Sequence, residues 1–153
     1  MACSGWCASL LLLANGAATA SVAKDLVALG ELITPAYIAM NLAVICAQHD
    51  PRFLSDTRGP RGTAVEYAQH VKDEAILALT HDEALVVLKT AADAARSTTR
   101  RELQTLTSNH PAIGNAEVAQ WCDDRAKSYV RTFIERHDGT HQAFLEQIER
   151  AKR

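Results

Sequence analysis

The polar and apolar positions of this chain repeat with the spacing of α-helices. From Ser21 onward no segment shows the strict alternation of a half-buried strand, and apolar residues instead recur every three or four positions. The pattern predicts an all-α protein, a compact bundle of four to five helices that forms one domain over residues 21–153. The full length of 153 residues is that of a single ordinary domain.

Residues that favour helix ends divide the first part of the bundle. A short opening helix is expected over residues 24–33, and Thr34 followed by Pro35 predicts a new helix start, because threonine favours the N-cap and proline is tolerated at the first helical position. This second helix is expected to end near His49, just ahead of the next proline. His49 shares the inward face of Ile45 and is therefore predicted to be a buried core histidine.

Two further helices are expected to open with capping boxes. Thr63 is followed by Glu66 and Thr80 by Glu83, in each case a hydroxyl with a glutamate three residues later. The second of these helices runs to about Leu106, and the alanines in its apolar stripe allow a neighbouring helix to approach closely. The stripe comprises Ala84, Leu85, Leu88, Ala91, Ala92, Ala95, Thr99, Leu103 and Leu106.

The last part of the chain predicts two helices separated by a glycine. The first begins at Asn115 and ends at His137, with Gly139 in the left-handed conformation that often closes a helix. Thr140 is expected to cap a last short helix whose apolar side chains face inward.

The first twenty residues differ from the rest. Residues 1–20 carry no charge, contain four consecutive leucines and end in Ala-Thr-Ala, a pattern typical of a cleavable secretion signal. We expect cleavage between Ala20 and Ser21 and a periplasmic or secreted location. Because no Lys or Arg precedes the apolar run, two alternatives stay open: an N-terminal helix that is retained, and a misplaced start.

Export would leave two of the four cysteines in the chain. Cys3 and Cys7 lie in the expected leader, whereas Cys46 and Cys122 lie on the predicted inner faces of different helices. In an oxidising compartment these two are expected to form a disulfide. The bridge would close a loop of about 76 residues, which the chain-entropy model values at about 4 to 5 kcal/mol. The alternative is a pair of buried thiols.

Composition and motifs exclude several classes of function. A formal charge of -2, from 16 basic and 18 acidic side chains, argues against a nucleic-acid-binding protein. No apolar run approaches the length of about 18 residues that spans a bilayer, so no membrane span is predicted. The chain has no Gly-x-Ser-x-Gly nucleophile motif, and Asp123 and Asp124 are adjacent and do not face each other. We therefore expect neither an enzyme nor a cofactor.

Two basic features are candidates for ligand binding. Arg58 and Arg61 surround a Gly-Pro turn that runs into the helix start at Thr63, where free backbone N–H groups favour anions. The alternative is a rigid loop with solvated arginines. Lys72 falls on a predicted apolar arc, either as an amine beside a cleft or as a stem that covers apolar surface while its charge stays in water.

Histidines form the candidate metal ligands. His137 and His141 are the densest cluster, although the predicted helix break between them leaves their relative geometry open. His137 has a structural alternative, as a cation at a helix C-terminus. A second row, Glu66, His70 and Asp73, can hold a metal or shuttle protons, but solvated helix faces commonly carry the same residues.

An aromatic and arginine pattern raises a further alternative. Trp121, Arg125 and Tyr129 recur at four-residue spacing, so the guanidinium can lie against both rings. If exposed, the three would form the mixture typical of protein interfaces; if buried, they edge the core, which is the interpretation we favour.

The function predicted from these features is binding without catalysis. The chain is similar in size and character to small periplasmic inhibitor and immunity proteins and to accessory subunits of envelope enzymes, an analogy of architecture that transfers no functional residue. Its partner is then expected to be another envelope or secreted protein. The alternative is a carrier of a small anionic ligand or of a metal ion.

Overall fold

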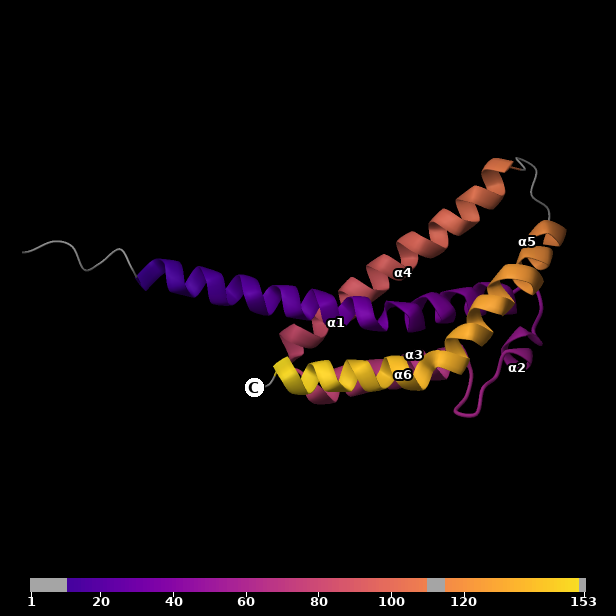
Figure 1. Ribbon diagram of the computed structural model, residues 1–153. Coiled ribbons are helices and arrows are strands. Elements are labelled where there is room, and N and C mark those ends of the chain that lie inside the picture. Colours follow the sequence, from indigo (N-terminus) through magenta and orange to yellow (C-terminus); the bar gives the residue numbers. More distant parts are fainter. Residues whose placement is uncertain (1–10, 110–114, 152–153) are drawn as a thin grey trace, which may run out of the picture.

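The computed structural model describes residues 11–109 and 115–151, and over these residues the protein contains six helices and no strand (Figure 1). The long helix α1 (Leu11–Ala47) passes through the bundle and packs against α3 (Ala64–Ala78) and α4 (His81–Asn109). The predicted all-α bundle is confirmed.

The C-terminal segment is a continuous run of helix with one π-helical turn inside it. Helix α5 (Asn115–Trp121) leads into a π-helical turn, η1 (Cys122–Ala126), and then into α6 (Lys127–Ala151), which packs against α1 and α3. A single short helix, α2 (Phe53–Asp56), lies in the connection between α1 and α3. The bundle therefore consists of four long helical segments.

The predicted helix start at Thr34 is wrong, because α1 continues through it. The Thr34 hydroxyl donates to the carbonyl oxygen of Gly30, 2.9 Å away and one turn earlier, and Pro35 lies inside the helix. An interior proline costs about 3 kcal/mol. Leu29 and Ala36, before and after it, are both buried, so packing on both sides of the proline outweighs that cost.

The predicted helix break at Gly139 is also wrong. Among the described residues Gly62 is the only glycine with positive φ, so Gly139 stays helical and α6 runs through it. Phe144 and Ile148 are buried beyond this point, and their packing continues the helix. His137 consequently lies in the middle of α6, 2% exposed, and not at a helix C-terminus.

Helix α1 lies close against α4 at Gly30. A Cβ atom there would lie 2.7 Å from the Cβ of Thr90 and 2.8 Å from the carbonyl oxygen of Val87, so only glycine fits. Leu85, predicted to be buried, is 53% exposed. Three alanines of the predicted stripe lie on the buried face of α4: Ala84, Ala91 and Ala95. Their small side chains agree with the expected close approach of a neighbouring helix.

Gly30 and Gly139 both lie inside helices, and alanine is expected to have opposite effects on stability at these two positions. Gly139→Ala should raise the free energy of unfolding by about 0.5–1 kcal/mol, because glycine is costly inside a helix and the new methyl group meets no atom within 4 Å. The matched variant Gly30→Ala should lower it by about 1 kcal/mol or more, through overpacking against α4. Urea denaturation measures both. A loss of stability in Gly139→Ala would instead support a left-handed helix end.

Cys46 and Cys122 form the predicted disulfide, which joins α1 to η1. Their sulfur atoms are 2.04 Å apart and their Cα atoms 5.5 Å apart. One apolar cluster surrounds this bridge and includes Phe53, and a second cluster, around Leu29 and Phe144, lies between α1, α3, α4 and α6. A covalent bond therefore holds one end of the C-terminal segment against α1, while apolar packing holds the other.

The N-terminal part of α1 is an apolar helix of the kind found in secretion signals. Residues 1–10 of the expected leader lie outside the described residues, and the remainder forms the first turns of α1, which extend beyond the other helices (Figure 1). Among the described residues, Asp25–Ala47 is long and apolar enough to cross a membrane, but 44% of an apolar 18-residue window within it is buried inside the protein. That no segment spans a membrane stays a prediction.

His49 is exposed, which contradicts its predicted place in the core. The helix ends at Ala47, and the backbone N–H groups of His49 and Asp50 both bond to the carbonyl oxygen of Cys46, at 3.0 and 2.9 Å. These bonds form a turn that ends the helix, so His49 no longer lies on the helix face that carries Ile45.

Candidate binding groove and histidine cluster

A groove of about 490 Å³ lies between the second half of α4 and the segment formed by η1 and the start of α6. Figure 1 shows α4 running at an angle away from α1 along this half. Ile38 and Leu42 of α1 line the groove with apolar side chains, and Glu102 and Asp124 line it with carboxylates. The arrangement combines an apolar lining with charged groups, as binding sites for peptides and small molecules do.

Trp121, Arg125 and Tyr129 all line this groove, yet their burial differs. Trp121 is 5% exposed and belongs to the core, whereas Tyr129 is 38% exposed and Arg125 is exposed. Arg125 reaches across the groove to Glu102 on α4, with 3.8 Å between Nη1 and Oε2. Partial burial raises the pKa of the Tyr129 phenol, which therefore stays protonated and able to donate. The favoured assignment of all three to the core edge is thus wrong for Arg125 and Tyr129.

Thr99 lines the same groove with an unused polar atom. Its side chain is 5% exposed, and its Oγ1 has no hydrogen-bond partner among the described residues. A buried hydroxyl without a partner costs about 1–3 kcal/mol. Thr99 also lines a second hollow of about 600 Å³ between α1 and α4, beside Val44 and Leu103. A ligand that bonds to this hydroxyl would recover part of that cost.

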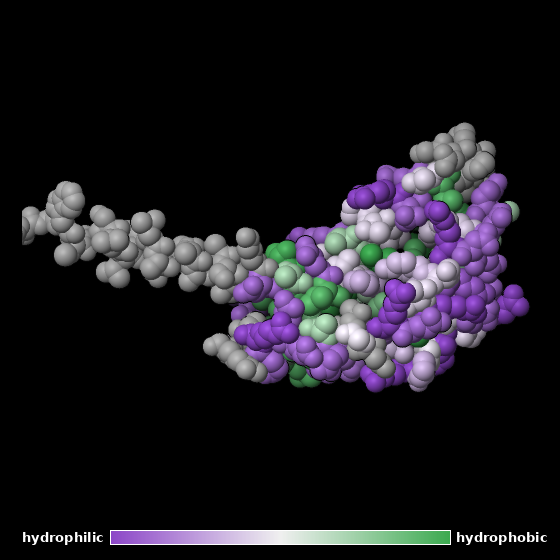
Figure 2. All heavy atoms as spheres, viewed as in Figure 1, coloured by the Kyte–Doolittle hydropathy of each residue, from purple (hydrophilic) through white to green (hydrophobic). Residues whose placement is uncertain are grey.

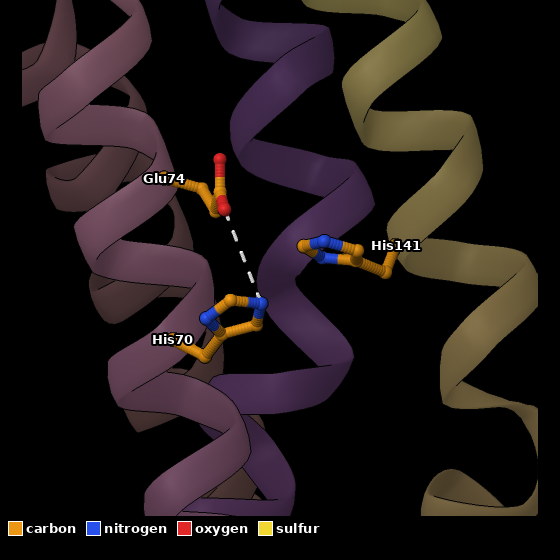
Figure 3. Close-up of side chains that lie close together, drawn as sticks. All are labelled: His70, Glu74 and His141. Atoms are coloured by element: carbon orange, nitrogen blue, oxygen red, sulfur yellow. Dashed lines mark ion pairs between the residues drawn. The ribbon is translucent and has the colours of Figure 1, made fainter.

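A cluster of three possible metal ligands lies between α3 and α6 (Figure 3). His70 and Glu74 are one turn apart on α3, and the His70 Nε2 lies 4.0 Å from the Glu74 Oε1. The His141 ring on α6 stacks beside the His70 ring, with 5.1 Å between centroids. One ligand atom from each residue lies within 4.8 Å of the others.

This cluster differs from the one expected from the sequence. The sequence pattern predicts a pair of His141 with His137 and a row of His70 with Glu66 and Asp73. The structure instead brings His141 to His70 and Glu74. The spacing of His70 and Glu74 is visible in the sequence as a one-turn pair, but the packing of α3 against α6 is not.

His137 lies behind the cluster and not in its opening. Its buried ring makes edge contacts with Tyr67 and Phe133, at centroid distances of 4.4 and 5.3 Å. The His141 ring is 5.5 Å away on the same helix. His137 and His141 are therefore adjacent in space as predicted, but the His137 ring lies in the core and the His141 ring is only partly buried.

The turn with Arg58 and Arg61 lines a hollow of about 420 Å³, together with Arg131. The helix start behind it is already capped: the Thr63 N–H donates to Glu66 Oε2 at 2.6 Å, and the Glu66 N–H donates to the Thr63 hydroxyl at 3.4 Å. These bonds, the first above all, hold the pKa of Glu66 below its usual range. Glu66 also forms an ion pair with Arg58, with 3.6 Å between Nη2 and Oε1, so a carboxylate of the chain lies beside this turn, and the binding of an external anion there stays a prediction.

Lys72 is exposed and lies outside the buried face of α3. That face consists of Tyr67, Ala68, Val71 and Ala75, with Ala64 at its start. Ile76, expected to share the buried arc, is 51% exposed. The predicted apolar arc around Lys72 is therefore wrong, because contacts with α1, α4 and α6 select a neighbouring face of the helix.

Exposed apolar side chains also gather near the turn between α3 and α4. Leu77 is 83% exposed, and Ile76, Leu85 and Val86 are each more than 40% exposed. Figure 2 shows apolar surface near the place where α1 leaves the bundle. Isolated apolar residues are common on protein surfaces, and nothing in the structure identifies a partner that covers these.

No known protein family matches the chain, and no curated protein or solved structure is significantly similar to it. A helical bundle by itself assigns no function. The groove and the histidine cluster are therefore the features of the described residues from which function can be argued.

Proposed function

We propose that the protein is exported and acts without catalysis, by holding a segment of another envelope or secreted protein in the groove between α4 and α6. The apolar start of α1 is compatible with a secretion signal cut after Ala20. The disulfide between Cys46 and Cys122 is typical of oxidising compartments such as the periplasm.

The observation that carries this proposal is the meeting of Trp121, Arg125 and Tyr129 in one groove. These three residue types dominate the binding energy of protein interfaces, where an aromatic side chain commonly sits in a well-packed pocket beside polar groups. Trp121 supplies the buried surface, and Tyr129 and Thr99 supply hydroxyls for a bound backbone. A groove of about 490 Å³ fits a few side chains of a peptide segment.

The charged side chains that line the groove indicate which charge the partner segment should carry. Glu102 pairs with Arg125, whereas Asp124 has no cationic partner within salt-bridge distance among the described residues. The rim therefore carries a net negative charge, which favours a cation beside the apolar side chains of the partner. An amphipathic helix with a Lys or Arg next to its apolar face meets both requirements.

Binding of designed peptides to the exported protein tests this function. Protein recovered from the periplasm of an expression host should begin at Ser21, which leaves Trp121 as the sole tryptophan and reporter of the groove. An amphipathic peptide with a leucine face and flanking lysines should shift the Trp121 emission. The same peptide with glutamates should bind about 5-fold more weakly, corresponding to about 1 kcal/mol.

A charge reversal provides the control. Asp124→Lys should reverse the preference between the two peptides, while the matched variant Asp82→Lys, an exposed carboxylate at the start of α4, should leave it unchanged. A product that still begins at Met1 would contradict export. An unchanged peptide preference in Asp124→Lys, or no emission change with either peptide, would contradict the groove.

A further inference from the structure

His70, Glu74 and His141 offer two imidazole nitrogens and one carboxylate oxygen at one point of the seam between α3 and α6 (Figure 3). We propose that these three residues bind one divalent transition-metal ion of the zinc type. The ion would join two helices that are far apart in the sequence, and this site is separate from the groove.

The chemistry of the three side chains favours this class of ion. Imidazole nitrogen is a preferred ligand of Zn²⁺, Ni²⁺ and Cu²⁺, whereas Ca²⁺ and Mg²⁺ take oxygen ligands almost exclusively. Two histidines with one carboxylate form a common three-residue ligand set, which leaves further coordination positions to water. The side chains of His70 and Glu74 are 52% and 34% exposed, so water reaches the open side.

The distances lie within reach of coordination. Nitrogen and oxygen ligands lie about 2.0–2.2 Å from such an ion, so two ligand atoms on the same ion lie about 3–3.5 Å apart. The ligand atoms here lie within 4.8 Å of one another, and His70 Nε2 is 4.0 Å from Glu74 Oε1. Closing the remaining gap of about 1 Å requires only side-chain rotation at a partly exposed site, with both helices held in place.

The surroundings of the cluster support the same assignment. Among the described residues no Lys or Arg forms an ion pair with Glu74, whose Oε1 lies 4.0 Å from the His70 Nε2. Behind the cluster the buried ring of His137, wedged between Tyr67 and Phe133, limits the positions open to the His141 ring. A cation would thus meet the Glu74 carboxylate, which is not paired with a Lys or Arg, and the His141 ring, whose orientation is restricted. Both features raise the affinity for the ion.

Calorimetric titration of the untagged, oxidised protein with ZnCl₂ tests the proposal. We expect one Zn²⁺ per chain, and the same site should give Co²⁺ a visible absorption, distinct from that of the free ion, whose intensity reports the coordination number. Saturating Zn²⁺ should also raise the midpoint of thermal unfolding, because the ion binds the folded arrangement of α3 against α6. Absence of Zn²⁺ binding to the wild-type protein would overturn the proposal.

Three substitutions assign the ligands. His70→Ala, Glu74→Gln and His141→Ala should each lower the affinity for Zn²⁺ at least 10-fold and weaken the Co²⁺ absorption. His70 and Glu74 are partly exposed, so these two changes leave the fold intact. The matched variants His49→Ala and His81→Ala replace exposed histidines outside the cluster and should bind as the wild type does.

One further variant separates this site from a pair formed by His137 and His141. His137→Phe keeps an aromatic ring between Tyr67 and Phe133 and should retain Zn²⁺ binding at the wild-type stoichiometry. Undiminished binding in both His70→Ala and Glu74→Gln would overturn the assignment. Because the groove variant Asp124→Lys should bind Zn²⁺ normally, failure of the metal site and failure of the proposed function are distinguishable.

Discussion

Replacing both Cys46 and Cys122 by alanine is expected to lower the free energy of unfolding by about 4 to 5 kcal/mol. The disulfide closes a loop of 76 residues, and in the chain-entropy model its main effect is to restrict the unfolded chain. That change is a large part of the total stability of an ordinary domain, about 5–15 kcal/mol. Urea denaturation of the oxidised wild type and of the double variant measures the difference.

The wild type with its disulfide reduced is the natural comparison, since it keeps both side chains and should lose a similar amount of stability. Thiol counting shows whether the bridge is present. The exported product, unfolded without reductant, should take up no alkylating reagent, and after reduction it should take up two equivalents. Uptake of two equivalents before reduction would contradict the bridge, as would equal stability of the double variant and the oxidised wild type.

The second large effect is expected from Phe144→Ala, which should cost about 3–5 kcal/mol. Phe144 is fully buried on α6, past Gly139, in the cluster that also contains Leu29, Val71 and Val87. Removing its ring leaves a cavity where α6 meets α1, α3 and α4, and close-packed neighbours relax only partly into such a space. The same denaturation experiment measures it.

Leu77→Ala is the control for this substitution. Leu77 is 83% exposed near the end of α3, so its truncation should change stability by no more than about 0.5 kcal/mol. If the residues after Gly139 formed a separate, loosely attached helix, Phe144→Ala would cost little more than this control. The losses in the Phe144 and cysteine variants should add, because the two sites belong to different apolar clusters.

Local signals in the sequence identified several features correctly. The capping box at Thr63 is present, and the bonds of Thr80 with Glu83 have the same form, because a cap depends on residues only three positions apart. The pairing of Cys46 with Cys122 was also predicted correctly, since each lies on an inward helix face and the other two cysteines fall in the expected leader.

The same kind of local signal failed at Pro35 and Gly139. Local sequence preference places each of these residues at a helix end. In the structure, however, Pro35 lies inside α1 and Gly139 lies inside α6. Burial of apolar residues before and after Pro35, and the docking of Phe144 beyond Gly139, outweigh the local preference. Contacts between distant segments determined these boundaries, and one sequence does not reveal which segments meet.

Helix class, capping and the cysteine pair were thus determined by the sequence alone, because periodicity and short-range hydrogen bonds act over a few residues. Only the tertiary structure decided which histidines meet and which residues line a groove. His70 and Glu74 meet His141 because α3 packs against α6, and Arg125 and Tyr129 border a groove because α4 runs at an angle away from α1. Helix orientation depends on how side chains of remote segments pack, and that information is spread over the whole chain.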